Sequence, residues 1–136
     1  SKEYPAILKI NSINKSLFIK DGKKKLKVRP IKVQHGKVDS ICYIINNKLA
    51  YISDVSHINT KDYKYFKNLD YIILDCLWLR HHPSHLNLES SLKLIKKFEP
   101  KKAILTNLHS DLDYQYLKSI LPKNVTPAHD GLTVSL

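Results

Sequence analysis

Methionine is absent from this chain of 136 residues, which also has only three glycines, two cysteines and one tryptophan. No apolar stretch approaches the ~20 residues that a membrane-spanning helix needs, and nothing resembles a signal peptide with a small-residue cleavage site. Cys42 and Cys76 lie within apolar strand patterns, so we expect both to be reduced core residues. These absences predict a cytoplasmic protein without a membrane segment. The missing initiator methionine predicts a processed product or a piece excised from a longer chain.

Acidic residues are scarce, which gives the chain a formal net charge of +11. The excess is uneven, because residues 1–37 contain eleven Lys or Arg and only two acids. Such a field concentrates phosphates or nucleic acid near a protein. An amino-acid composition rich in Lys, Asn and Ile is also typical of proteins from an A- and T-rich genome. The positive charge could therefore reflect genome composition alone, and this alternative stays open. The run Lys23-Lys24-Lys25 indicates the solvated tip of a hairpin, and nothing indicates specific nucleic acid binding.

The length and the hydrophobic content of 43% predict a single domain over residues 1–136. After Asp54, helix and strand patterns alternate, which is typical of an α/β protein. Strands are predicted at 6–10, 17–19, 26–33, 41–45, 49–52, 69–74, 103–105, 125–128 and 132–136. Helices are predicted after Asn59 or Thr60, after Asn87, and after Ser110 or Asp111.

Residue types that bind metals or phosphate recur where the predicted strands end. His35 follows the strand at 26–33, Asp54 follows 49–52, and His109 follows 103–105. In an open α/β sheet, functional groups collect beyond the carboxyl ends of the strands. A di-metal hydrolase needs imidazole and carboxylate groups that converge from separate rigid elements, with one carboxylate able to touch both ions. Each of these residues also fits a helix cap, so spacing alone leaves both interpretations open.

Several segments together resemble the metallo-β-lactamase-fold hydrolases of the PhnP type. They are Ala50-Tyr51-Ile52-Ser53-Asp54, Leu74-Asp75-Cys76-Leu77 followed by His82-Pro83-Ser84-His85, Leu105-Thr106-Asn107-Leu108-His109-Ser110-Asp111-Leu112-Asp113-Tyr114, and Pro127-Ala128-His129-Asp130-Gly131-Leu132. The resemblance runs from about Tyr4 to the end of the chain. It implies a hydrolase that cleaves phosphodiesters, including cyclic ones, with two divalent ions such as zinc or manganese.

The resemblance assigns a role to four residues. His35 matches a metal-binding histidine, Asp54 matches the bridging carboxylate, and His109 matches the last histidine ligand. His85 resembles the catalytic histidine that contacts the substrate phosphate and assists the leaving group. Asp54 and His85 are therefore the expected catalytic residues.

Three more residues are expected around this set. His82 is expected beside His85 and His109 in a pocket for phosphate or nucleotide, since imidazole donates to phosphate oxygens. Asp111 and Asp113 are expected to cap the last helix. The hypothesis also stays open that they orient the His109 imidazole from behind.

The family signature His-x-His-x-Asp-His, which supplies most of both metal sites, does not occur between Ser1 and Leu136. The sequence therefore resembles the carboxyl-terminal half of the αββα fold, with one mixed β-sheet and helices on one face. The three remaining ligands predict weak or absent metal binding and no catalysis by this chain alone. An uncovered apolar sheet face predicts association with a complementary amino-terminal half or with a second copy.

Two functions stay open at this stage. The first is an incomplete metal-dependent phosphodiesterase that acts on phosphodiester, cyclic phosphodiester or nucleotide substrates once it is completed. The second is a non-catalytic basic module that binds a nucleotide monophosphate or phosphate near His82, His85 and His109. Such a module would catalyse no reaction and could form a dimer with a second copy of itself.

Overall fold

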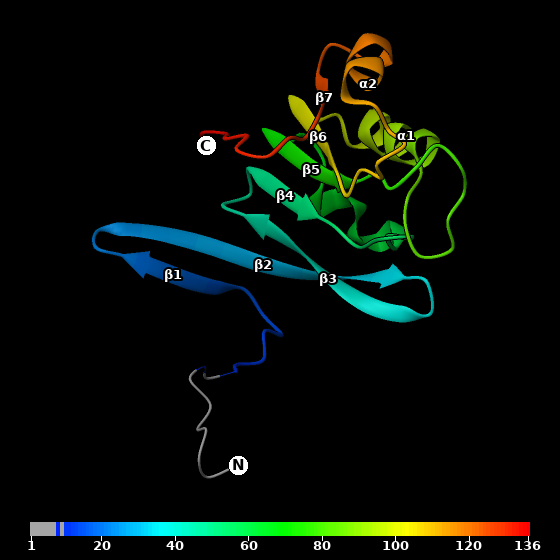
Figure 1. Cartoon of the computed structure of the whole chain (residues 1–136). Coiled ribbons are helices and arrows are strands. Elements are labelled where there is room, and N and C mark those ends of the chain that lie inside the picture. The colour runs from blue at the N-terminus through cyan, green and yellow to red at the C-terminus, as the bar shows by residue number, and fades with distance from the viewer. Residues whose placement is uncertain (1–7, 9) are drawn as a thin grey trace, which may run out of the picture.

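One seven-stranded sheet, in the order β1-β2-β3-β4-β5-β6-β7, organises the computed structural model, which describes residue 8 and residues 10–136 (Figure 1). The strands are β1 (Leu17–Asp21), β2 (Lys24–His35), β3 (Val38–Ile45), β4 (Leu49–Ile52), β5 (Tyr71–Asp75), β6 (Lys102–Thr106) and β7 (Val125–Pro127). Strands β1 to β4 pair antiparallel, whereas β4 to β7 pair parallel. This mixed sheet confirms the predicted α/β class.

Helical segments lie between the strands of the parallel half. They are the 3-10 helix η1 (Thr60–Tyr65) and the α-helices α1 (Leu88–Phe98) and α2 (Tyr114–Ile120). Asn59 caps η1 and Asn87 caps α1, as predicted, because each side chain accepts a backbone N–H of the first turn. Helix α2 begins later than predicted. Its cap is Asp113, whose carboxylate accepts a backbone N–H at 2.7 Å, and not Ser110 or Asp111.

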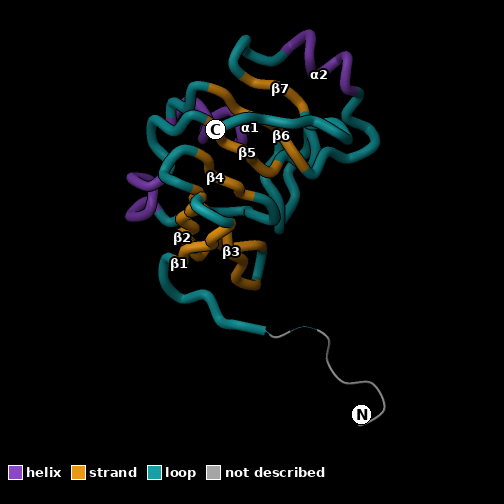
Figure 2. The backbone as a smooth tube through the Cα atoms, turned by 90° about the vertical axis from the view of Figure 1, so that its left-hand side faces the viewer, coloured by secondary structure: helices purple, strands orange, loops and turns teal. Residues whose placement is uncertain are grey.

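The helices cover one face of the sheet (Figures 1 and 2). Side chains alternate along a strand, so every second residue of β2 to β7 points toward the helices. The buried residues on this side include Ile31, Val33, Cys42, Ile44, Ala50, Ile52, Ile72, Leu74, Ala103 and Leu105 from the strands, with Phe66, Ile95, Phe98 and Leu117 from the helical side. This one-sided core confirms the expectation of helices on one face.

The expected hairpin at Lys23-Lys24-Lys25 is present, and a second tight hairpin joins β3 to β4. The β1–β2 turn contains Gly22 with a positive φ of 56°, and the β3–β4 turn contains Asn46 and Asn47 at 51° and 53°. These residue types tolerate the left-handed conformation that such turns require. Pro30 lies two residues beyond Val28, the last β2 residue that pairs with β1, and therefore stands at a local edge of the sheet, where a proline is tolerated.

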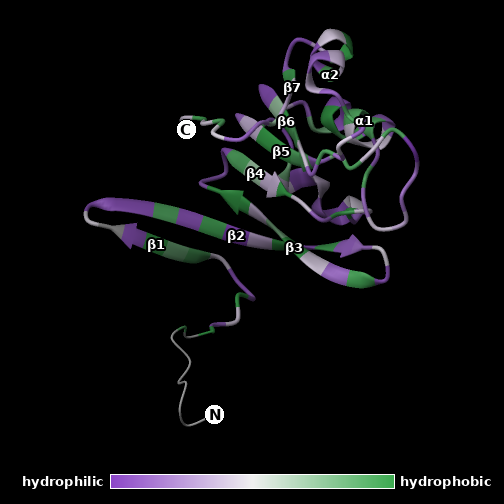
Figure 3. Ribbon diagram, viewed as in Figure 1, coloured by the Kyte–Doolittle hydropathy of each residue, from purple (hydrophilic) through white to green (hydrophobic). Residues whose placement is uncertain are grey.

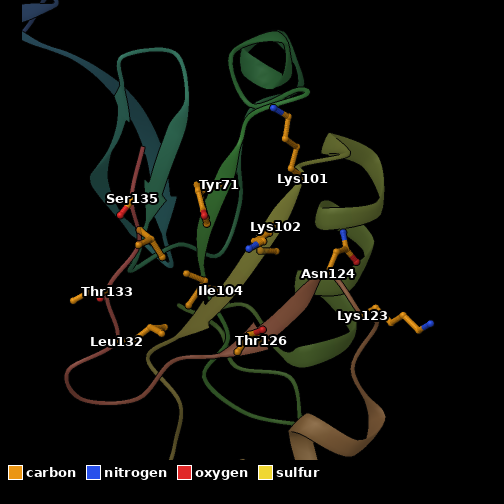
Figure 4. A pocket seen from close by; sticks show the side chains of 12 residues that line it. Tyr71, Lys101, Lys102, Ile104, Lys123, Asn124, Thr126, Leu132, Thr133 and Ser135 are labelled. Atoms are coloured by element: carbon orange, nitrogen blue, oxygen red, sulfur yellow. The ribbon is translucent and has the colours of Figure 1, made fainter.

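Residues 132–136 were predicted to form a strand, and they do not. The tail crosses the face of β5 and β6 instead of lying beside an edge strand, so it has no ladder to join (Figure 4). The strand predicted at 6–10 falls mostly outside the described residues, and the described Leu8 and Ile10 are not in a strand. Among the described residues, no helix has the length and apolarity needed to cross a bilayer.

The face of the sheet opposite the helices carries a row of side chains that runs across five strands. The pairing register aligns Tyr43, Tyr51, Ile73, Ile104 and Thr126. Tyr51 stays 40% exposed on this face. The tail leaves a hollow of about 690 Å³ here, with Ile104 and three lysines, Lys101, Lys102 and Lys123, among its lining residues (Figure 4). We call this surface the open face.

Candidate metal centre

Three residues from distant parts of the chain converge at one rim of the sheet. His35 ends β2, Asp54 lies two residues after β4, and His85 stands in the loop between β5 and α1. Each offers one possible ligand atom, and these atoms all lie within 4.8 Å of one another. The His35 and His85 rings meet edge to face, with their centroids 4.6 Å apart. The fold therefore brings together three of the residues that the sequence singled out.

His35 is oriented through its own ring nitrogen. Its Nδ1 donates to the carbonyl oxygen of Ser84 at 2.7 Å, since a carbonyl can only accept, and this leaves Nε2 as the free nitrogen. Gly36 permits the approach of the 84 loop, because its φ is 64° and an added Cβ would lie 2.6 Å from the Ser84 Oγ. The bond from a ring N–H to a carbonyl is typical of a metal-binding histidine.

Asp54 and Asn107 both adopt left-handed backbone conformations beyond the ends of their strands, with φ of 51° and 60°. This conformation is uncommon for residues other than glycine, although Asp and Asn tolerate it best, and it is enriched at functional sites. The amide nitrogen of Asn107 donates to Asp54 Oδ1 at 3.3 Å. The Asp54 carboxylate is exposed at the rim, so it remains accessible to a ligand.

Asp75 lies beneath this rim and is completely buried. Its carboxylate accepts three hydrogen bonds, from Val55 N–H at 3.1 Å, Asn107 Nδ2 at 3.2 Å and His85 Nδ1 at 2.8 Å. A buried charge is tolerated only when it is paired and hydrogen-bonded in this way. Because the carboxylate accepts from Nδ1, His85 keeps its other nitrogen, Nε2, available.

Sequence reasoning assigned no role to Asp75 or Asn107. The available signal for Asp75 was an acid set between the buried residues Leu74 and Cys76, where a solvated charge does not fit. The signal for Asn107 was weaker, because an Asn after a strand is common in turns. We call the group His35, Asp54, Asp75, His85 and Asn107 the Asp75 rim.

His82 stands next to this group, with its ring centroid 5.2 Å from that of His85. Its Nδ1 accepts the backbone N–H of Ser84 at 3.2 Å, which helps to fix the loop that also holds His35. An open hollow of about 600 Å³ borders the rim, lined by His35, Gly36, Lys37, Val38, Pro83 and Ser84. A small anion entering it would face the His35 imidazole and Lys37.

His109 does not belong to the converging group. Its ring stacks on Trp78, with centroids 5.2 Å apart and an interplanar angle of 28°. Its Nδ1 lies 3.2 Å from the backbone nitrogen of Asp111 and 3.4 Å from the carboxylate of that residue, while Asp113 caps α2 instead. Asn107, two residues earlier, is the residue of this segment that reaches Asp54. The assignment of His109 as a metal and phosphate ligand stays a prediction.

The two cysteines lie outside the rim's converging ligand group. Both are buried and free. Burial raises the pKa of the Cys42 and Cys76 thiols to about 12, mainly because a thiolate is poorly solvated in the core. Neutral thiols do not act as metal ligands, which agrees with the expectation of core cysteines.

Comparison with known families and structures gives the family. The sequence pattern of the beta-lactamase superfamily domain matches residues 2–107, more than half of the chain. The chain belongs to the beta-lactamase superfamily. Its fold is that of the metallo-β-lactamase proteins, which confirms the resemblance seen in the sequence. No curated protein matches the chain in sequence.

Solved structures of this superfamily match the chain over most of its length. A diphosphatase from the PhnP family is 27% identical, with a TM-score of 0.83 over 92% of this chain and 47% of that one. The metallo-β-lactamase-fold protein YhfI from Bacillus subtilis is 18% identical, with a TM-score of 0.74 over 95% and 56% of the two chains. Zn²⁺-bound PqqB from Methylobacterium extorquens is 17% identical, with a TM-score of 0.64 over 82% and 50%. The chain thus spans about half the length of these relatives.

The side chains of the rim fit a divalent cation. Imidazole nitrogen and carboxylate oxygen are the donors that zinc and manganese take in proteins. Both histidines of the group have their second nitrogen anchored, one to a carbonyl and one to a buried carboxylate. Within the part of the chain that the structure describes, this is the one group of at least three such residues. Three donors are fewer than a closed metal site uses.

Proposed function

We propose that this superfamily member supplies part of the active site of a metal-dependent phosphodiesterase. The observation that carries the proposal is the convergence of His35, Asp54 and His85 within 4.8 Å, on a fold shared with a PhnP-family diphosphatase. His35 and Asp54 would hold a divalent ion, either zinc or manganese. Such an ion supplies Lewis-acid polarisation of a phosphoryl oxygen and lowers the pKa of water.

His85 is the residue that handles the substrate in this proposal. With Nδ1 bound to Asp75, its Nε2 is the nitrogen that contacts a phosphate oxygen or gives a proton to the leaving oxygen. Asp75 acts as a positioning residue, because its carboxylate fixes the ring orientation and stabilises the protonated imidazole. His82 extends the anion-binding surface beside it.

The remaining ligands come, in this proposal, from a second polypeptide segment that covers the open face. The row from Tyr43 to Thr126 is an unpartnered surface of mixed apolar and polar side chains, and the chain spans about half the length of the solved relatives. A complementary amino-terminal half or a second copy of the chain would bury this row. Phosphodiester and cyclic phosphodiester bonds are the proposed substrates.

Metal binding tests the first step. Isothermal titration with zinc or manganese should show binding that weakens at least about tenfold in Asp54→Ala, because one charged ligand is lost. Asp130→Ala is the matched control, since Asp130 is an exposed aspartate in the turn after β7, outside the group. Equal affinities for the wild type and Asp54→Ala would contradict the proposed ligand set.

Hydrolysis of bis(p-nitrophenyl) phosphate tests the second step. Turnover is expected when the chain is mixed with a polypeptide that carries the His-x-His-x-Asp-His segment, and it should vanish in Asp54→Ala but not in Asp130→Ala. Phosphate binding that persists in a chelator, with no turnover in any mixture, would instead support the non-catalytic phosphate-binding module.

A further inference from the structure

The β1–β2 hairpin extends away from the helical side of the molecule, and its tip is strongly hydrophilic (Figures 1 and 3). The cross-strand register pairs Lys20 with Lys25 and Phe18 with Lys27. Directly paired residues of antiparallel strands project from the same face, and so do alternate residues along one strand. One face of the hairpin therefore carries Phe18, Lys20, Lys25, Lys27 and Arg29, which we call the cationic stripe.

The opposite face of the hairpin is apolar except for the pair Asp21–Lys24 beside the turn. It carries Leu17, Ile19, Leu26 and Val28, of which Val28 is only 8% exposed and Ile19 is 52% exposed. The lysines of the paired strands, except Lys24 beside the turn, thus share one face. A solvated lysine-rich tip, which the sequence indicated, would not require this sorting, because every side chain there would meet water equally.

Aromatic rings accompany the cations on the stripe. The Lys25 ammonium lies 3.8 Å from the centroid of the Phe18 ring, and Phe18 is 51% exposed. At the other end, the Arg29 guanidinium lies 4.8 Å from the centroid of the Tyr65 ring of η1, which Lys64 also approaches at 5.1 Å. Among the residues whose side chains the structure describes, no carboxylate forms an ion pair with a stripe cation.

We propose that the cationic stripe binds the backbone of single-stranded nucleic acid. Alternate residues of a strand repeat about every 6.7 Å, a spacing similar to that of successive phosphates in an extended single strand. Cations at this spacing would meet phosphates, and Phe18 would offer a face on which a base stacks. Such recognition is independent of sequence, which agrees with the absence of a specific binding motif.

The stripe and the Asp75 rim occupy the same strand. Residues 25, 27, 29, 31, 33 and 35 of β2 project from one face, so His35 lies on the stripe's face, beyond the buried Ile31 and Val33. Six residues separate Arg29 from His35, about 20 Å along the strand. A ligand that reaches both must be a strand of several nucleotides. This substrate assignment rests on the proposed function, whereas binding to the stripe does not.

A membrane surface fits this hairpin less well than a nucleic acid does. A segment that lies on a bilayer turns its apolar face toward the lipid. Here that orientation would point Lys20, Lys25 and Lys27 away from the anionic headgroups, because they share the other face. A ligand that approaches the stripe meets cations and the Phe18 ring together, which matches the alternation of phosphate and base.

Fluorescence anisotropy with a fluorescein-labelled oligouridine strand, in a chelator and over a series of salt concentrations, tests the proposal. The triple variant K20Q/K25Q/K27Q should bind at least about tenfold more weakly, and the slope of log K against log salt should fall by about 2, which is three lost contacts at about 0.7 each. The matched control K96Q/K118Q/K123Q removes the same charge from exposed lysines elsewhere and should weaken binding less than about threefold.

Phe18→Ala separates stacking from charge. It should weaken binding about fivefold or more while leaving the salt slope unchanged. Equal losses in the two triple variants, no binding by the wild type, or stripe-dependent binding to phosphatidylserine vesicles without binding to the oligonucleotide would each overturn the proposal. Metal-dependent turnover without oligonucleotide binding would overturn this inference alone, whereas oligonucleotide binding without turnover would leave the stripe and remove the proposed hydrolase.

Discussion

The Asp75 rim and the loop that holds His109 are built from the same residue types but in opposite ways. At the rim, His85 is bound to a buried carboxylate, and that carboxylate collects donors from three separate segments. In the loop, which we call the His109 loop, the exposed ring stacks on Trp78 and lies beside the nearby Asp111. The first arrangement exists only in the folded sheet, while the second combines stacking on Trp78 with a local contact between His109 and Asp111.

The difference teaches how to judge a histidine next to an aspartate. In a buried hydrogen-bonded pair, removal of one partner leaves the other without a partner away from water, which is costly. An exposed pair gains little, because water competes for both partners. We therefore expect strong effects from substitutions at the rim and weak effects from the matching substitutions in the loop.

The largest expected effect is on stability. Asp75→Ala should lower the free energy of unfolding by about 3 kcal/mol, because it leaves His85, the Val55 N–H and Asn107 without their buried acceptor. Asp111→Ala, at an exposed position, should change it by less than about 0.5 kcal/mol. Urea unfolding measures both values. Similar losses for the two variants would break the contrast between the rim and the loop.

The second effect concerns metal affinity. His35→Ala should weaken zinc binding at least about tenfold, since it removes a donor whose orientation is fixed by Ser84. His109→Ala should change the affinity less than about twofold, because its ring lies on Trp78 and outside the converging group. Calorimetric titration of both variants decides the point. An equal loss in His109→Ala would instead support the predicted role of that residue as a ligand.

The smallest expected effect separates two glycines. Gly22 and Gly36 both have positive φ, but an added Cβ meets nothing within 4 Å at Gly22 and lies 2.6 Å from Ser84 Oγ at Gly36. Gly22→Ala should cost about 1 kcal/mol for the left-handed conformation alone. Gly36→Ala should cost about 1 kcal/mol more, because the loop beside His35 must shift. Thermal unfolding of the two variants measures the difference in stability between them. Equal losses of stability would show that the loop around Ser84 can move aside at no cost.

The sequence alone predicts much of this fold. Short apolar runs locate the strands of the parallel half to within a few residues. Asn59 and Asn87 mark two helix starts, because an Asn side chain accepts a first-turn N–H. The tail was mispredicted as a strand, because a strand needs a neighbouring edge as well as a suitable pattern. Whether a segment finds a strand to pair with depends on the whole fold, so the local sequence pattern does not reveal it.

The candidate site was predicted less completely than the fold. The strand ends correctly indicated that His35 and Asp54 would approach each other. Nothing local indicated that Asp75 would serve His85, or that Asn107, and not His109, would face Asp54. These contacts depend on left-handed turns after β4 and β6, and a difference of two residues along such a turn changes which side chain points inward.

The buried thiols have a practical consequence. Cys42 lies on β3 and Cys76 directly follows β5, so the two stand on either side of β4. Because only the thiolate reacts with alkylating reagents, a protonated and enclosed sulfur is silent while the sheet is intact. The rate at which each cysteine is alkylated would therefore report how often its own half of the sheet opens. Mass spectrometry of the labelled peptides would tell which half opened first.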